Sequence, residues 1–371
     1  MNRTPEDRAV AVPLAVILAF GFLVVAIAIY QTTVVPAETA ETEYEHSTTV
    51  RSEFVGLADA IDTAATEGST TPSTVTLGTN YPFRPAFVGP PAASGTIETV
   101  GLGVMSIENA SYPGVSNPDR RYETWGLRYS PQYTRYDVGA DTWLEHGIAV
   151  RRADSGSSVA LSEQRLVEGS RLSVTVLNGS FSETASGRVT VPTRPLSADE
   201  TTVAVTQNAS GNLTLVAPTR LTESTWDRLL AAERTPEGNV TEVSVVEQEG
   251  EADELRITLT NGSYDLDVAS VAVGPGAAEP EPAYLFRRTQ NQTVPTDATV
   301  PVSVQVRDRY DNPVSGVRMN YSVDCEQSAP IRSDERGIAT CEYTASGSGS
   351  INVSIENDAE IATRIEFDIV S

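Results

Sequence analysis

The N-terminal part of the chain carries the strongest hydrophobic pattern. Ala9–Tyr30 is a run of 22 residues without a charged side chain. Because a helix rises about 1.5 Å per residue, the run reaches about 33 Å and can cross a hydrocarbon core of about 30 Å. The sequence therefore predicts a membrane-spanning helix, with residues 1–8 on one side of the membrane and the remaining bulk on the other.

The polar segment 31–67 is predicted to continue as a helix. One apolar stripe runs along it with spacings of three and four residues, at Val50, Phe54, Leu57, Ala58 and Ile61. The run that starts at Gly68 and reaches Pro72 should end this helix. Two interpretations fit the stripe: an extended stalk, as in type IV pilins, or a juxtamembrane helix that packs on its own domain.

The region 75–273 changes to a period of two, which predicts a β-rich extracellular part of one or two modules. The alternating runs include Leu172–Val176, Val189–Val191, Val203–Val205 and Leu255–Leu259. Asn261 and Gly262 follow the last run and precede another alternating one. An Asn-Gly pair in this place predicts a hairpin with a type I′ turn.

Two segments interrupt the β pattern. Ser224 and Asp227 have the spacing of a capping box, which predicts a short helix that leads into a Leu-Leu pair. The Pro-rich segment 274–282 has no apolar period and is predicted to be a linker. It separates the β-rich region from a C-terminal domain, 283–371.

The amino-acid composition indicates a high-salt environment and argues against a nucleic-acid partner. The net charge is −24, with 50 acidic residues against 26 basic ones, all of them Arg. Carboxylates retain water and cations at high salt, where charge repulsion is screened, and Arg forms bidentate pairs. We interpret this as a halophilic protein; an ordinary acidic secreted protein from a GC-rich genome is the alternative. Since a basic footprint is lacking, we expect no nucleic-acid partner.

Charges beside the apolar run predict the topology. Arg3 and Arg8 precede the run, whereas acids follow it, so the N-terminus should stay in the cytoplasm and the bulk should be extracellular. The same side carries nine N-x-Ser/Thr motifs, which predict a glycosylated outer surface. The acceptor residues are Asn109, Asn178, Asn208, Asn212, Asn239, Asn261, Asn291, Asn320 and Asn352.

The start of the chain resembles a known family. Arg8 before a small residue, followed by an apolar run with Pro13 near its beginning, is similar to the N-termini of haloarchaeal type IV pilin-like proteins. The resemblance implies cleavage between Ala9 and Val10 by a prepilin peptidase, and assembly with other pilin-like subunits. The Glu of the bacterial pattern is missing. An uncleaved anchor and a Sec signal cut after Ala28 remain as alternatives.

The C-terminal domain carries a second resemblance. A strand that ends at Asp308, the turn Asn312-Pro313-Val314 and a later turn at Asp334–Gly337 are similar to bacterial Ig-like domains of the invasin/intimin type. The resemblance implies a β-sandwich. Cys325 and Cys341, the only two cysteines, fall on candidate strands that flank the second turn. We predict a disulfide between them, because the bulk of the chain is expected outside the cell.

The sequence shows no catalytic, cofactor-binding or metal-binding set. The two histidines are about 100 residues apart; His46 is expected to be exposed and His146 to occupy a turn. Acids near Asp267 and Asp308 lack the spacing of an EF-hand loop, and we expect solvated turn carboxylates rather than calcium ligands. A group of aromatic residues suggests core packing, with a carbohydrate-stacking surface as the alternative. It comprises Tyr122, Trp125, Tyr129, Tyr133, Tyr136 and Trp143.

These patterns together predict a mainly β protein, with an N-terminal transmembrane or stalk helix, a sandwich-like middle region and a C-terminal Ig-like sandwich. The predicted role is a membrane-anchored, extracellular structural or adhesive glycoprotein of a halophilic archaeon, or more finely a minor pilin-like subunit, and not an enzyme. Two alternatives remain: a surface enzyme such as a glycan-acting hydrolase in the aromatic middle region, and a scaffold that binds other envelope proteins.

Overall fold

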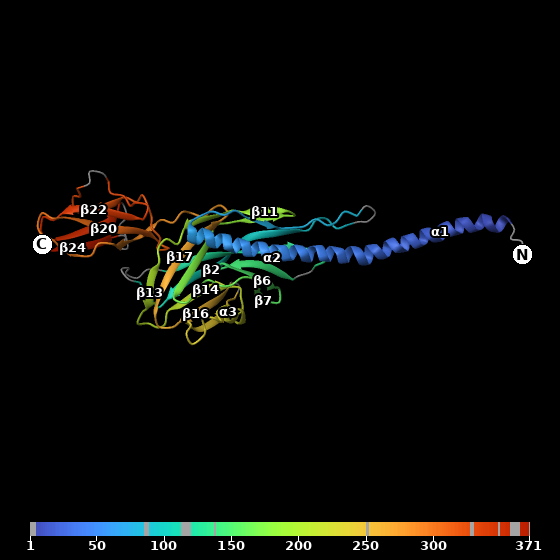
Figure 1. Ribbon diagram of the computed structural model, residues 1–371, viewed down its shortest axis with the longest axis horizontal. Coiled ribbons are helices and arrows are strands. Elements are labelled where there is room, and N and C mark those ends of the chain that lie inside the picture. The colour runs from blue at the N-terminus through green and yellow to red at the C-terminus, as the bar shows by residue number, and fades with distance from the viewer. Residues whose placement is uncertain are drawn as a thin grey trace.

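The protein is mainly β, with one long N-terminal helix, as the sequence predicts. The computed structural model describes residues 5–84, 89–112, 120–136, 139–249, 252–326, 330–347, 349–356 and 364–370. The helix projects from one end of the middle domain, and the C-terminal domain lies at the opposite end (Figure 1). Residues 1–4 of the predicted cytoplasmic segment lie outside the described ranges.

One continuous helical rod leads into the β domains. It consists of α1 (Pro5–Ile29), a π-helical turn (Tyr30–Val34) and α2 (Val35–Glu67). The π turn lies directly before Pro36, where the missing N–H and the ring of proline disturb the regular hydrogen-bond ladder. Gly68 ends α2 in a left-handed conformation with φ of 64°.

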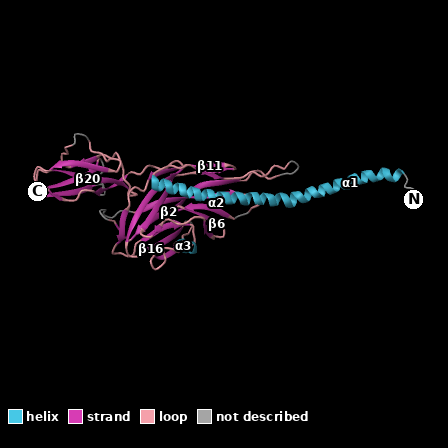
Figure 2. Ribbon diagram, in the orientation of Figure 1, coloured by secondary structure: helices cyan, strands magenta, loops and turns pink. Residues whose placement is uncertain are grey.

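Two large sheets and one two-stranded sheet form the middle domain (Figure 2). The larger sheet has the strand order β15-β16-β14-β2-β4-β5-β6-β7, and β10 also pairs with β2. The smaller sheet has the order β3-β13-β17-β9-β8, and β12 also pairs with β17. The two-stranded sheet consists of β1 and β11. The large sheet comprises β2 (Ser94–Glu108), β4 (Arg121–Gln132), β5 (Ala140–Glu145), β6 (Ile148–Ala153), β7 (Ser158–Ala160), β10 (Ser182–Ala185), β14 (Thr214–Thr219), β15 (Val240–Val246) and β16 (Asp253–Leu259). The other strands are β1 (Ser73–Thr76), β3 (Ala110–Ser111), β8 (Val167–Glu168), β9 (Arg171–Asn178), β11 (Arg188–Val191), β12 (Thr193–Ser197), β13 (Val203–Gln207) and β17 (Ser263–Val273).

The apolar stripe of α2 is part of the core of the middle domain. Phe54 and Leu57 are fully buried, and they share one apolar cluster with Ile97 and Leu127 of the large sheet and Val271 of the small one. Of the two interpretations of the helix, packing on its own domain is therefore the one that the structure supports. A second cluster fills the space between the two sheets and includes Trp226.

The predicted hairpin at Asn261–Gly262 is wrong. β16 pairs with β14 and β15, whereas β17 belongs to the other sheet, so the chain crosses the core at this point. Neither Asn261 nor Gly262 has a positive φ angle. The alternation correctly identified the buried side chains of both strands, but in a sandwich two consecutive strands can bury the same core from opposite sheets.

The predicted capping box is also misplaced. The short helix exists as α3 (Glu223–Leu229), but its N-cap is Thr222, and no side chain caps it. Ser224 therefore lies inside the first turn. The Thr222 hydroxyl lies instead within hydrogen-bond distance of Ser224 and Thr225 hydroxyls, at 3.1 and 3.0 Å.

The C-terminal domain is a small two-sheet sandwich. One sheet consists of β18 (Pro282–Arg287), β20 (Thr299–Asp308) and β22 (Ile338–Thr344); the other consists of β19 (Gln292–Thr293), β21 (Met319–Tyr321), β23 (Gly349–Ile355) and β24 (Arg364–Val370). Val304 and Val306 are fully buried between them, as predicted. Gly337 has φ of 70°, and a Cβ there would meet the Val306 carbonyl oxygen at 2.6 Å, so only glycine fits.

Truncating the stripe should destabilise the middle domain. Phe54→Ala leaves a cavity between α2 and both sheets, and we expect the free energy of unfolding to fall by about 3–5 kcal/mol. The matched control is Val159→Ala, because Val159 is 55% exposed, and should change it by less than about 0.5 kcal/mol. Denaturant unfolding of the full chain in detergent micelles measures both; equal effects would contradict burial of the stripe.

Candidate functional site: an apolar helix and the contacts that orient it

The apolar part of α1 has no protein cover. From Pro13 to Ile29 every described side chain is exposed, and the large ones, such as Phe20 and Phe22, are 64% and 75% exposed. The helix is long and apolar enough to cross a membrane, with a mean hydropathy of 2.6 in its most apolar window. Apolar side chains in this number are stable only when another apolar phase or molecule covers them. The Ala9–Val10 bond lies within α1.

Glu43, on α2, fixes the position of this helix against the middle domain. Its side chain is completely buried and accepts hydrogen bonds from the backbone N–H groups of Thr134, Arg135 and Tyr136 at 2.7, 2.8 and 2.5 Å. The hydroxyl of Tyr81 donates to the same carboxylate. Burial alone would raise the pKa of Glu43, but these hydrogen bonds outweigh it and lower the pKa. The site is therefore built for a carboxylate.

His46 continues the same contact, and its predicted exposure is wrong. The imidazole is buried, with its two ring nitrogens 2.6 Å from the Tyr133 hydroxyl and 2.9 Å from the Thr76 carbonyl oxygen. Burial lowers the pKa of His46. A sequence signal for this was present, because Glu43 and His46 extend the spacing of the apolar stripe toward the N-terminus. They therefore share its buried face.

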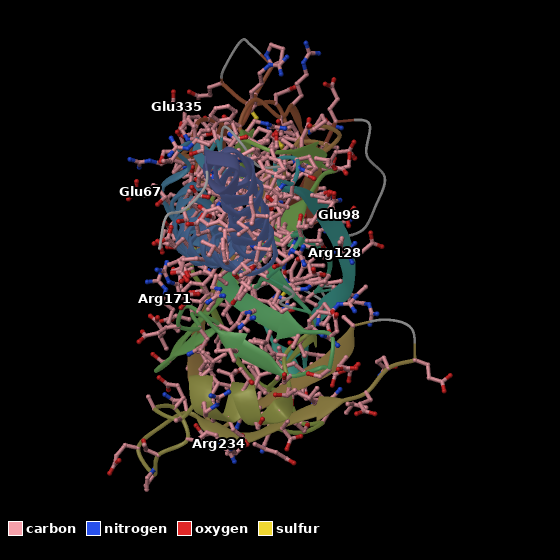
Figure 3. The ribbon with its side chains drawn as sticks, turned by 90° about the vertical axis from the view of Figure 1, so that its right-hand side faces the viewer. Glu67, Glu98, Arg128, Arg171, Arg234 and Glu335 are labelled. Atoms are coloured by element: carbon pink, nitrogen blue, oxygen red, sulfur yellow. A yellow bond between two sulfur atoms is a disulfide. The ribbon has the colours of Figure 1, made fainter. Side chains whose placement is uncertain are left out.

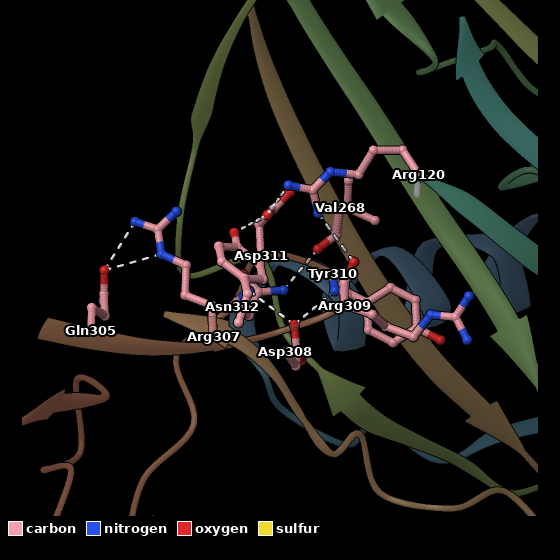
Figure 4. Close-up of polar contacts among 10 residues, drawn as sticks. Arg120, Val268, Gln305, Arg307, Asp308, Arg309, Tyr310, Asp311 and Asn312 are labelled. Carbon is pink, nitrogen blue, oxygen red and sulfur yellow. Dashed lines mark hydrogen bonds and ion pairs between the residues drawn. The ribbon is translucent and has the colours of Figure 1, made fainter. Parts of the chain in front are cut away.

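A second polar contact joins the C-terminal domain to the middle domain, and we call it the domain junction. It is formed by the turn after β20, residues 308–312 (Figure 4). The Asp308 carboxylate accepts hydrogen bonds from the N–H groups of Tyr310 and Asn312, at 2.8 and 3.0 Å. Asp311 has φ of 74°, a conformation that Asp and Asn adopt more readily than most residues. Burial raises the pKa of Asp308 to about 6.

Asn312 reaches across the junction with all of its amide hydrogen-bonding groups. Its side-chain nitrogen donates to the Val268 carbonyl oxygen at 2.7 Å and to the Ser197 hydroxyl at 2.8 Å. Its side-chain oxygen accepts from the Glu200 N–H at 3.1 Å. Since the residue is only 3% exposed, each bond is made away from bulk water and is costly to leave unmade.

A buried ion pair lies on the other side of the same turn. Arg120, in the segment before β4, contacts the Asp311 carboxylate at 2.6 Å, with the two side chains 3% and 1% exposed. Tyr284 donates its hydroxyl to Asp311, and the Arg120 guanidinium lies 4.7 Å from the Tyr112 ring centre. Although burial alone would lower the pKa of Arg120, Asp311 raises it. Removing either partner would leave a charge buried without its counter-charge.

One short segment connects the C-terminal end of α2 to the domain junction. The N–H of Asp199 donates to the Ala65 carbonyl oxygen near the end of α2, at 2.8 Å, and the next residue, Glu200, donates to Asn312. The end of the helix and the C-terminal domain are therefore attached to the same two residues of the middle domain.

The expectation of solvated turn carboxylates is thus only partly right. Asp265 is exposed, but Asp267, Asp308, Asp311 and Asn312 are all buried. The sequence showed acids near turns, but not that a second domain covers one of these turns. Within the described residues, no group of three or more acids, histidines or cysteines is arranged to hold a metal ion.

Two open cavities of the middle domain have acidic side chains in their walls. One, of about 440 Å³, lies beside α2 and has acids and arginines in its wall but no aromatic residue. Burial and Asp267 raise the pKa of Asp199 there to about 6. The other, of about 390 Å³, combines Tyr133, Tyr136 and Asp141. It is where the alternative glycan-acting enzyme would place its substrate.

The remaining predicted residues lie at the surface or in the core. All nine Asn acceptors of the glycosylation motifs are at least partly exposed. Cys325 and Cys341 form a disulfide, with Cα atoms 5.3 Å apart; Cys341 is on β22, but Cys325 follows β21 in a loop rather than a strand. Tyr122, Tyr129 and Trp143 are buried, as core packing requires. In the view along the helix, Glu98 and Arg128 lie to one side of the domain and Arg171 to the other (Figure 3), and all three side chains are partly exposed.

Comparisons with known proteins place the chain as follows. No family model matches it. A protein of Archaeoglobus fulgidus described as uncharacterized is 24% identical over 370 residues, which is 95% of this chain and 61% of the relative. The chain thus spans about three-fifths of that relative's length.

Among solved structures, the D0-D1 domain of intimin covers 44% of this chain and 91% of its own, with 11% identity and a TM-score of 0.20. The Escherichia coli adhesin FdeC covers 73% and 86%, with 13% identity and a TM-score of 0.19. A chimeric titin Z1Z2 covers 54% and 90%, with 17% identity and a TM-score of 0.18.

Replacing the buried carboxylate should loosen α2. Glu43→Gln keeps the shape but places an amide nitrogen against backbone N–H donors, and we expect the free energy of unfolding at neutral pH to fall by about 1–3 kcal/mol. Because the folded-state pKa of Glu43 is lowered, its contribution is present above the unfolded pKa of about 4.3 and is lost as pH falls through the folded value. Unfolding curves of both proteins between pH 7 and pH 3 should therefore converge in acid; a constant difference would contradict this assignment.

The junction can be tested with a matched pair of asparagines. Asn312→Ala removes three hydrogen bonds and takes this partner from the buried Val268 carbonyl and the buried Ser197 hydroxyl, so we expect the C-terminal domain to lose about 2–4 kcal/mol of stabilisation by the middle domain. Asn320→Ala, at an exposed position of the same domain, should have almost no effect. Hydrogen exchange at residues 197–200 reports the loosening; unchanged protection in Asn312→Ala would refute the junction.

Proposed function

We propose that this chain is a membrane-anchored surface protein that holds a β-sandwich away from the membrane in a structural or adhesive role. The main observation behind this proposal is that the apolar side chains of residues 13–29 are exposed at one end of the helical rod, whereas the other end of the rod packs into a folded domain. A bilayer is an apolar phase of matching thickness. The N-terminus is cytoplasmic and the bulk extracellular in this proposal, because Arg3 and Arg8 flank the run.

Several features support an outward-facing role. The C-terminal sandwich, Ig-like in our proposal, lies at the end of the molecule farthest from α1 (Figure 1). Its disulfide suits an oxidising compartment, and the glycosylation motifs lie at accessible positions. The partners proposed are the membrane and other pilin-like or envelope proteins, with no nucleic acid and no cofactor. The acidic, lysine-free composition supports a halophilic archaeal source.

The finer proposal is a pilin-like subunit, and the mature N-terminus tests it. Mass spectrometry of the protein from purified envelopes should find a first residue of Val10 if a prepilin peptidase cuts after Ala9. Peptides that begin at Met1 or Asn2 would contradict the pilin version but keep the anchor. A start at Ile29 would contradict both, because the apolar segment would then have been removed.

The proposal assigns no catalytic step. A hydrolase is the second candidate, and the cavity with Tyr133, Tyr136 and Asp141 is the observation that favours it. Release of reducing sugar from envelope polysaccharide, lost in Asp141→Asn, would support that candidate over a structural role.

A further inference from the structure

Outside the apolar helix, one large apolar side chain is almost fully exposed. Phe83 is 90% exposed, more than any other large apolar side chain in the described part of the chain. It lies after β1 in the described segment 77–84, which runs beside α2 (Figure 1). A single exposed apolar residue needs no explanation by itself. The position of Phe83 along the helical rod, however, places it close to the expected membrane surface.

Two contacts fix that position. Tyr81 donates its hydroxyl to Glu43, and Arg84 donates to Glu38 through Nε and Nη2, at 3.0 and 2.6 Å. The Arg84 side chain is only 7% exposed, so the loop is firmly held against α2. Between Tyr81 and Arg84 the chain therefore descends from the level of residue 43 to the level of residue 38, and Phe83 lies on this descent.

The level of Glu38 corresponds to the edge of a bilayer. Residues 9–37 contain no charged side chain, and Glu38 is the first charge after them. As a helix these 29 residues span about 44 Å, which equals the thickness of a bilayer with its headgroups, about 40–45 Å. The middle domain also reaches this level, because Val35 is only 4% exposed. No free length of helix separates the domain from the membrane.

We propose that the segment 81–84 is a second membrane contact, in which the phenyl ring of Phe83 enters the lipid headgroup region beside the apolar helix. This rests on the proposed membrane anchorage. The helix tilt typical of membrane proteins, about 20°, brings one side of the domain down to the headgroups. Phosphatidylcholine, which carries no net charge, is the suitable probe lipid, because Glu38 is paired with Arg84 whereas Glu41 and Glu45 would repel anionic headgroups. The contact fixes the side of the domain that faces the membrane.

Nitroxide labels on cysteine variants of the full chain, in phosphatidylcholine nanodiscs, test the proposal. The native cysteines are paired and do not interfere. Oxygen partitions into lipid and a neutral nickel complex into water, so the ratio of their collision rates with a label reports its surroundings. Labels at Phe83 and at the neighbouring Pro82 should show a several-fold higher oxygen-to-nickel ratio than a label at Val246, which is exposed and lies at an edge strand.

Two further variants make the outcome unambiguous. Adding Phe83→Asp to the Pro82 label should return its ratio to the value at Val246, whereas Phe83→Leu should not. A label at Ile27 reports the anchorage itself. If Ile27 is in lipid but Phe83 and Pro82 resemble Val246, the loop contact is wrong and the anchorage stands; if Ile27 is also in water, the anchorage is wrong. Protection of Phe83 from both reagents would show a protein partner and would also overturn the lipid contact.

Discussion

The structure depends on one helical rod, α1 and α2, whose two ends have different surroundings. At one end its side chains are apolar on all sides and have no protein cover; at the other end one face is buried in a domain core and the rest is polar. Apolar burial alone is not directional, because it is roughly proportional to the area removed from water. Apolar contacts such as those of Phe54 and Leu57 fix which face of α2 is buried, but they set its position along its axis less strictly.

Buried polar groups supply the missing direction. A displacement of α2 by one residue would withdraw the Glu43 carboxylate from three backbone N–H donors and leave these donors without their acceptor. The same reasoning applies to the domain junction, where Asn312 and the Arg120–Asp311 pair each require one relative position of the two domains. Buried ion pairs are weak evidence for stability. Here the buried polar groups specify an orientation. The segment 199–200 links the helix to the outer domain, because Asp199 bonds to Ala65 and Glu200 bonds to Asn312.

The sequence predicted the elements better than their contacts. The long apolar N-terminal helix, the stripe of α2, the period-two strands, and the turns at Gly68 and Gly337 are local patterns, and each was identified correctly. The sheet partners of β16 and β17 were not, because alternation reports which side chains are buried but not against which strand. His46 and Asp308 were placed in water for a related reason: a polar residue is buried only when distant segments supply its partners. For Glu43 and His46, spacing alone could have given the answer; for Asn312, nothing local could.

The central claim is that the helix, the middle domain and the outer sandwich form one rigid unit that projects from the membrane. Pulsed dipolar spectroscopy between spin labels at Glu45→Cys on α2 and Arg336→Cys on the outer domain tests it most directly, since both native residues are exposed. The account predicts a single narrow distance distribution in nanodiscs. A broad or multimodal distribution would show that the outer domain moves freely on the middle one, and would contradict it.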